Sequence, residues 1–249
     1  MNNPQHMNSI GDRLIAIILF CLFGMDAVYF TIRFLVEGLE QVTNSAALNN
    51  LHYYLFSVSA SAILFWGVIM LCAAGLAALA LRSEGVLQQA WPKAPFTLET
   101  LRLTTLVFVI DCVMSLLIMR VMALFSPDKS VDMIKPGYEY QVSWSMFPAD
   151  LFTTVFAAPL AEEFLFRGAL FSALIARGSG PVVAILVSSA LFAFGHGQYE
   201  WQGLVLVFFG GTVLGFLRWY TGGLIAPLIC HAAYNFWVTS SNYWATLSS

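Results

Sequence analysis

Three short polar motifs interrupt the apolar second half of this sequence. They are Glu162-Glu163-Phe-Leu-Phe-Arg167, Phe192-Ala-Phe-Gly-His196 and His231-Ala-Ala-Tyr-Asn235. Carboxylates and imidazoles transfer protons, and imidazole and amide N–H groups donate hydrogen bonds to a developing oxyanion. These residue types therefore suit general acid–base chemistry in a shared site.

The spacing within the motifs predicts that each presents its polar groups on one helical face. Residues four apart lie on the same face of a helix, which applies to Phe192 with His196 and to His231 with Asn235. Glycines on both sides of His196 allow backbone and substrate to approach closely. We expect three helices to direct a carboxylate, imidazoles and an amide into one shared cavity.

The two adjacent glutamates are predicted to have different roles. Neighbouring helical residues are separated by about 100°, so the two side chains cannot point the same way. Glu163 precedes Arg167 by four residues, which is the favourable order for an intrahelical ion pair. Glu162 is left without an obvious local cation, and a carboxylate in such an apolar pocket suits the role of general base. The hypothesis is that Glu162 does chemistry while Glu163 and Arg167 form the scaffold.

The elements that must position these groups are predicted to be membrane helices. The chain is 59% hydrophobic and only 10% charged, far outside the range of soluble proteins. Its apolar residues form long runs of the kind needed to cross about 30 Å of hydrocarbon. The candidate spans are Leu14 to Val36, Tyr53 to Leu81, Leu103 to Phe125, Leu151 to Ile175, Val182 to Phe194, Leu204 to Trp219 and Leu224 to Val238. We expect an all-α, polytopic membrane helical bundle of about seven transmembrane helices with a polar intramembrane cavity.

A polar loop at 126–144 divides these expected helices into two groups. We predict an N-terminal three-helix membrane region at 1–125, this extramembrane loop, and a four-helix core at 145–249 that holds all three motifs. Basic residues in short loops favour the cytoplasmic side, and most of them fall on one side if the spans alternate. The N-terminus is therefore predicted to be cytoplasmic, and the first apolar run is interpreted as a retained helix.

Charge, cysteines and hydroxyl groups argue against several other classes of function. A net charge of −3 gives no basic surface for nucleic acid, and the four cysteines lie singly in different expected spans, which predicts neither a disulfide framework nor a CxxC site. Ser188 and Ser189 precede His196 by about two helical turns, and Cys230 lies about 100° round its helix from His231. No serine or cysteine is therefore well placed as a nucleophile.

The ordered motifs EExxxR, FxxxH and HxxxN resemble those of the CAAX-processing and bacteriocin-processing (CPBP) membrane proteins, which include the type II CAAX prenyl endopeptidases. The resemblance covers Leu151 to Thr239, and no motif position departs from the pattern. It implies that 145–249 is a catalytic core of an intramembrane endopeptidase of the glutamate type. The three N-terminal helices carry no such signature.

The resemblance also implies a role for each motif residue. Glu162 and His196 are expected to activate a water, and His231 and Asn235 to stabilise the oxyanion. Glu163, Arg167 and Phe192 are expected to support them. Neither a metal nor another cofactor is expected, and the implied partners are the lipid bilayer and a membrane-anchored protein or peptide substrate. Short loops and compact length indicate a prokaryotic member in the cytoplasmic (inner) membrane.

Three alternatives stay open at this point. A carboxylate and two histidines are plausible zinc ligands, although the sequence has no HExxH motif and Asn235 suits an oxyanion better than zinc. The second alternative is a non-catalytic membrane adaptor or immunity protein of the same fold. A small transporter would place intramembrane acids on a proton path, but the polar residues show no matching inverted repeat.

Overall fold

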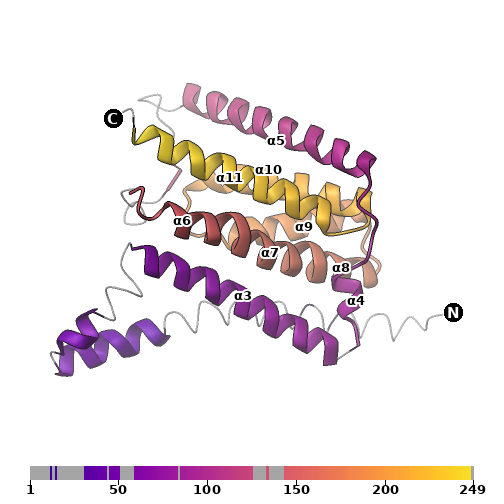
Figure 1. Ribbon diagram of the computed structural model, residues 1–249. Coiled ribbons are helices and arrows are strands. Elements are labelled where there is room, and N and C mark those ends of the chain that lie inside the picture. The colour runs from indigo at the N-terminus through magenta and orange to yellow at the C-terminus, as the bar shows by residue number, and fades with distance from the viewer. Residues whose placement is uncertain are drawn as a thin grey trace.

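The computed structural model describes residues 12, 15, 31–43, 45–50, 59–83, 85–125, 133–134 and 143–247. This described part is helical throughout its ordered elements, with one isolated β-bridge and no longer strand. Figure 1 shows a bundle in which α3 (Ala60–Ser83) and α5 (Leu98–Phe125) lie on opposite sides of the helices from the second half of the chain. The prediction of an all-α bundle is confirmed.

The other described helices are shorter or lie inside the bundle. They are α4 (Leu87–Ala90), a helix of mixed α and π type that spans 147–176, α9 (Pro181–Phe194), α10 (Trp201–Thr221) and α11 (Ile225–Ala245), with further helical residues at 31–43 and 46–50. Within the described residues, α3, α5 and α10 are long and apolar enough to cross a membrane. The first expected span and the start of the second lie mostly outside the described residues, so the number of seven stays a prediction.

Helix α5 shows the polarity expected of a helix in lipid. Its buried residues are Thr104, Asp111 and Ser115, whereas its exposed face carries large apolar side chains such as Leu106, Val109, Ile110, Val113, Leu116 and Leu117. The buried face packs against α10 and α11. Polar groups inside and apolar groups outside are the arrangement that a bilayer favours, and the protein is an integral membrane protein.

The fourth expected span is a continuous helix with two π-helical stretches, a feature that the apolar run did not predict. Its successive parts are α6 (Phe147–Asp150), η1 (Leu151–Ala157), α7 (Ala158–Glu162), η2 (Glu163–Leu170) and α8 (Phe171–Ala176). Pro159 sits in the first turn of α7, and proline has no N–H to continue an α-helical ladder. π-helical turns occur frequently at functional sites, and η2 contains Glu163 and Arg167.

The ends of the last three helices follow local sequence signals. Helix α9 starts with Pro181 after an extended Gly180, and α10 ends where Gly222 adopts a left-handed φ of 70°. The expected end of the last span at Val238 is wrong as a helix end, because α11 continues to Ala245. Hydropathy marks where a helix meets water, whereas backbone hydrogen bonding continues beyond that point. The hydroxyl of Tyr243, in this extension, donates to the Asp150 carboxylate.

A close backbone approach fixes η2 against α4 and makes Gly168 hard to replace. We expect Gly168→Ala to lower the free energy of unfolding by about 1–3 kcal/mol, the usual cost of overpacking. A Cβ at this position would lie 2.3 Å from the carbonyl oxygen of Ala90. Thermal unfolding in detergent measures the effect, with Gly75→Ala as the control because nothing lies within 4 Å of a Cβ there. Equal melting temperatures for the two variants would contradict the prediction.

Candidate active site

Glu163 and Arg167 form the ion pair that their spacing predicts. Arg167 Nη1 donates to Glu163 Oε1 at 3.0 Å, and both side chains are at most 1% exposed. Arg167 also reaches two other helices: its Nη2 donates to the carbonyl oxygen of Gly211 at 3.1 Å, and its guanidinium carbon lies 4.4 Å from the centroid of the Phe192 ring. The pair therefore links η2 to α9 and α10.

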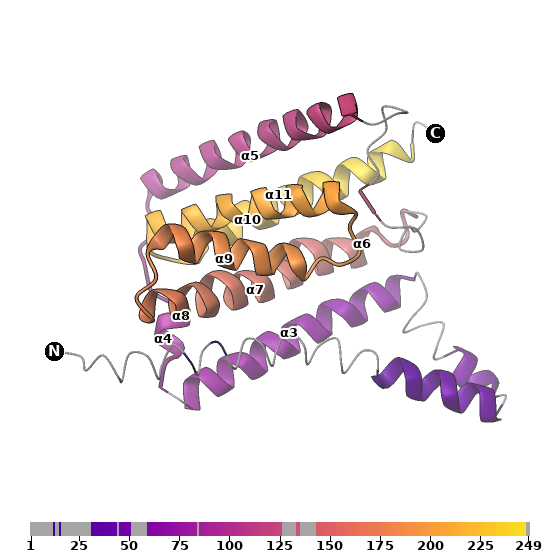
Figure 2. The same cartoon turned by 180° about the vertical axis from the view of Figure 1, so that it is seen from behind.

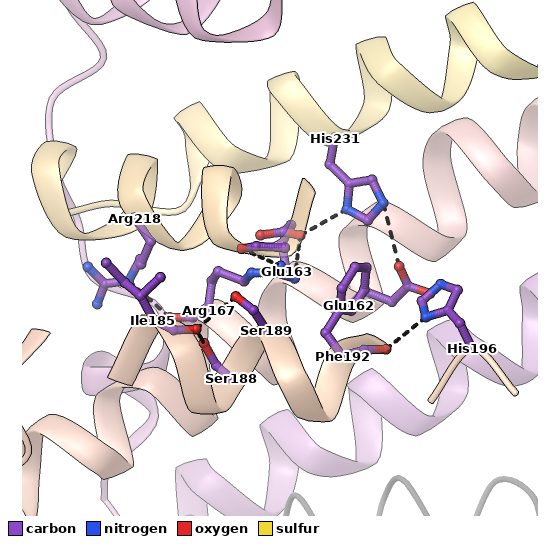
Figure 3. Close-up of polar contacts among 11 residues, drawn as sticks. Glu162, Glu163, Arg167, Ile185, Ser188, Ser189, Phe192, His196, Arg218 and His231 are labelled. Atoms are coloured by element: carbon purple, nitrogen blue, oxygen red, sulfur yellow. Dashed lines mark hydrogen bonds and ion pairs between the residues drawn. The ribbon is translucent and has the colours of Figure 1, made fainter. Parts of the chain in front are cut away.

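His231 lies between the two glutamates and contacts both. Its Nδ1 is 2.9 Å from Glu163 Oε1, and its Nε2 is 3.6 Å from Glu162 Oε2 (Figure 3). Glu162 has no cation on its own helix as a partner here, but it does have an imidazole from another helix, as the expected shared cavity requires. His231 lies on α11, 69 residues after Glu162 in the chain. Residue spacing within the helix that carries Glu162 could not reveal this contact. Two glutamates that point in different directions thus meet opposite nitrogens of one imidazole.

The hydrogen bonds of the two histidines fix where their protons lie. Glu163 Oε1 as a carboxylate accepts from His231 Nδ1, and the carbonyl oxygen of Phe192 accepts from His196 Nδ1 at 2.8 Å. A carbonyl oxygen only accepts, so His196 Nδ1 must carry hydrogen. In the neutral form, His196 then has a lone pair at Nε2, ready to accept a hydrogen bond or a proton.

The Phe192 ring brings the two histidines together. Its centroid is 4.7 Å from that of His196 and 5.8 Å from that of His231, with the rings edge to face in both pairs. Figure 3 shows Glu162 beside Phe192, on the side of the ring where His196 lies. The first three polar groups of the expected site, Glu162, His196 and His231, are thus gathered around one aromatic ring.

Asn235 occupies the expected helix face but already makes one strong contact. Its Nδ2 donates to the carbonyl oxygen of Thr154 at 2.7 Å, in the first π-helical stretch. The Thr154 hydroxyl lies 3.1 Å from that of Thr239, one turn further along α11. An amide nitrogen carries two hydrogens, so one N–H of Asn235 is left for another acceptor.

Two residues near the site, Arg218 and Tyr199, were not among the candidates chosen from the sequence. Arg218 donates from Nε to the carbonyl oxygen of Arg167 at 3.0 Å, which satisfies a backbone group of η2. Tyr199 stacks on His196 with an interplanar angle of 9° and a centroid distance of 5.9 Å. A cation inside the apolar run of α10 was a usable signal for Arg218, because such charges need a partner. Tyr199, in a connection, carried no comparable signal.

The pKa of Tyr199 depends on its burial and on the charge of Glu162. Burial raises the pKa of its hydroxyl, and the charge of Glu162 raises that pKa further. The hydroxyl is therefore neutral at physiological pH and keeps its hydrogen. Tyr199 thus brings a hydrogen-bond donor and an aromatic face to the rim of the site.

The exposed fraction of the side chains increases from Glu163 through His231 to Glu162. The Glu163 side chain is 1% exposed, that of His231 8% and that of Glu162 14%. His196 lies just past the end of α9, between exposed glycines at 195 and 197. The site therefore opens toward the connection between α9 and α10, which Figure 2 shows at the same end of the bundle as α6.

Comparison with known proteins finds similarities for the segment that contains the site. Residues 144–237 match the family described as type II CAAX prenyl endopeptidase Rce1-like. An Escherichia coli protein described as an uncharacterized 24.3 kDa protein is 34% identical over 83 residues, which are 32% of this chain and 38% of that protein. The aligned part thus spans well under half of that relative. No solved structure gives a significant match.

The matched segment contains every residue of the three motifs, and it agrees with the resemblance to CPBP proteins that the motifs indicate. The matched family is one of endopeptidases of the CAAX-protease type. Residues 144–237 of this integral membrane protein match the model of the Rce1-like family of type II CAAX prenyl endopeptidases.

Proposed function

We propose that the protein is an intramembrane endopeptidase that hydrolyses a peptide bond of a membrane-associated protein or peptide. The observation that carries the proposal is the grouping of Glu162, His196 and His231 around Phe192, in a bundle with an apolar outer surface. Ionisable groups are costly in a bilayer, and their convergence at an open end is better explained by chemistry than by packing. The grouping supports a mechanism that uses water as the nucleophile.

In the proposed mechanism, Glu162 is the general base and His196 orients the water. The lone pair on His196 Nε2 accepts a hydrogen bond from the water, and Glu162 takes its proton as the oxygen bonds to the peptide carbonyl carbon. The carbonyl electron pair moves to oxygen, and the tetrahedral intermediate forms. When the C–N bond breaks, the proton held by Glu162 passes to the leaving nitrogen, so the base is regenerated.

We assign the stabilisation of the oxyanion to His231 and Asn235, which both lie on α11. His231 donates from Nε2 when that nitrogen carries a proton, and Asn235 donates from the amide hydrogen that Thr154 does not use. Loss of one such donor typically costs about 2.7–4 kcal/mol of transition-state stabilisation. Glu163 and Arg167 do not touch the substrate in this proposal; they hold the ring of His231 in position.

The remaining parts of the chain have supporting roles in this proposal. We assign 145–249 as the catalytic core, 126–144 as an extramembrane loop, and 1–125 as a membrane region where the specificity of this member resides. The N-terminus is proposed to be cytoplasmic and the host membrane a prokaryotic inner membrane. The apolar exposed faces of α3 and α5 are compatible with contacts to lipid and to a membrane anchor of the substrate.

The proposal is tested by incubating the protein in liposomes with a library of membrane-anchored peptides. Wild type is compared with Glu162→Ala and His196→Ala, after circular dichroism and thermal unfolding have shown that both variants fold. Cleavage by wild type alone supports the enzyme. If no peptide is cleaved and both variants still complement a deletion in cells, the chain acts as a membrane adaptor instead.

Proteolysis is expected to continue in the presence of metal chelators. A catalytic zinc takes three protein ligands and a water, and the sequence has no HExxH motif of the kind that helical metalloproteases use. Asn235, the remaining polar group of the set, suits an oxyanion better than zinc. Among the described residues, no three His, Cys, Asp or Glu side chains are grouped to hold a metal ion. The rate is measured with and without chelator on the purified protein. Loss of activity that stoichiometric zinc restores would establish the zinc-dependent alternative.

A further inference from the structure

A short extended segment of the chain pairs with the connection that follows His196. The backbone N–H of Glu200 donates to the carbonyl oxygen of Met133 at 2.9 Å, and Ile134 and Tyr199 form an antiparallel β-bridge. Met133 and Ile134 come from the loop between α5 and α6, far from this connection in sequence. Two segments from different halves of the chain therefore form a minimal β-ladder at the open end of the site.

The local sequence is adapted to this close approach. A Cβ on Gly203 would lie 2.8 Å from the carbonyl oxygen of Met133 and 2.8 Å from the Cβ of Tyr199, so a larger residue at 203 would push the two segments apart. On the other face of the ladder, Tyr199 stacks on His196. The ladder is thus in contact with a residue proposed to activate water.

Proteolysis requires a kind of contact that this ladder provides. A peptide in a membrane helix has its carbonyl groups shielded by intrahelical hydrogen bonds, so the segment to be cut must first become extended. Its exposed N–H and C=O groups then need partners, and pairing with a strand edge supplies them. The backbone of Tyr199 and Glu200 is an edge of this kind, placed next to His196 and Glu162.

We propose that the Tyr199–Glu200 backbone is the edge on which the substrate binds as an extended segment, through main-chain hydrogen bonds. Met133 and Ile134 occupy this edge when substrate is absent. The occupant of this edge in the structure supports the assignment, because it is itself a short paired segment, with Met133 half-buried and Ile134 exposed. This inference rests on the proposed function and adds to it a binding mode.

A reversible tether between the two segments tests the proposal. Residues 133 and 200 lie opposite each other in the ladder, and opposed residues are about 4.5–5.5 Å apart at Cα, within the range of a disulfide. In Met133→Cys/Glu200→Cys, oxidation should lower the rate of cleavage at least about tenfold, and reduction should restore it, because the substrate has to displace the tethered segment. Each single-cysteine variant, oxidised in the same way, is the matched control, and its rate should not change on oxidation.

A second measurement separates this proposal from the proposed function. A membrane-anchored apolar peptide with a photoreactive residue is cross-linked to the same double-cysteine protein, and labelling of residues 196–203 is mapped by mass spectrometry. Labelling should be strong in the reduced protein and lost in the oxidised one, whether or not any peptide is cleaved. Equal labelling or equal cleavage in both states shows that the bridge merely anchors the loop, and overturns the proposal.

Discussion

Glu162→Gln is expected to abolish peptide hydrolysis while the bundle stays folded. Glutamine has the size of glutamate and keeps an oxygen that can face His231, 3.6 Å away, but its amide cannot accept a proton from water. General acid–base catalysis typically contributes a factor of about 10²–10⁴, so kcat should fall by that amount with KM little changed. Cleavage of a membrane-anchored peptide in liposomes measures both constants.

Glu163→Gln is the matched control, because it makes the same chemical change one residue further along the helix. Glu163 Oε1 is the acceptor for both Arg167 and His231. Glutamine keeps an oxygen there but not the negative charge, so the buried Arg167 loses its counter-charge, and stability and the order of the His231 ring should fall together with activity. The two variants are therefore distinguished by unfolding and not by activity alone. If Glu162→Gln stays active, and Glu163→Gln is stable but inactive, the two glutamates have the opposite roles.

The helices of the second half were predictable because the hydrophobic runs begin and end close to prolines and glycines that bound helices. Pro181 and Gly195 bracket α9, and Gly222 ends α10, within a few residues of the expected bounds. The π-helical stretches were not predictable, because they depend on where backbone carbonyls find partners in other helices. Arg218, for example, donates to the carbonyl oxygen of Arg167 from 51 residues away.

The membership of the site was predictable, but its internal contacts were not. Helical spacing and the cost of polar groups in a membrane single out Glu162, His196, His231 and Asn235. Spacing describes one helix at a time, so it revealed the pair of Glu163 with Arg167 and missed the contacts that His231 makes with both glutamates. Nor did it reveal that one N–H group of Asn235 binds the carbonyl oxygen of Thr154.

The second large effect is expected at Arg167, whose removal should destabilise the whole core. The side chain is 0% exposed and bonds to Glu163 and to the carbonyl oxygen of Gly211. In Arg167→Met, the carboxylate of Glu163 stays buried without its main cation, and breaking such a pair typically costs about 3–5 kcal/mol. Thermal and denaturant unfolding in detergent, followed by tryptophan fluorescence, measure the loss.

The double variant Glu163→Gln/Arg167→Met decides whether this loss comes from an unpaired charge or from lost volume. Burial of two charges in a low-dielectric interior is itself expensive, and neutral residues of similar size often replace a buried ion pair at little cost. The double variant should therefore be more stable than Arg167→Met, although it lacks one more native side chain, and it should remain inactive if His231 needs the Glu163 carboxylate to hold it. A double variant as unstable as the sum of the two single variants would mean that Arg167 stabilises η2 through its bond to Gly211 and its packing on Phe192, and that its charge is secondary.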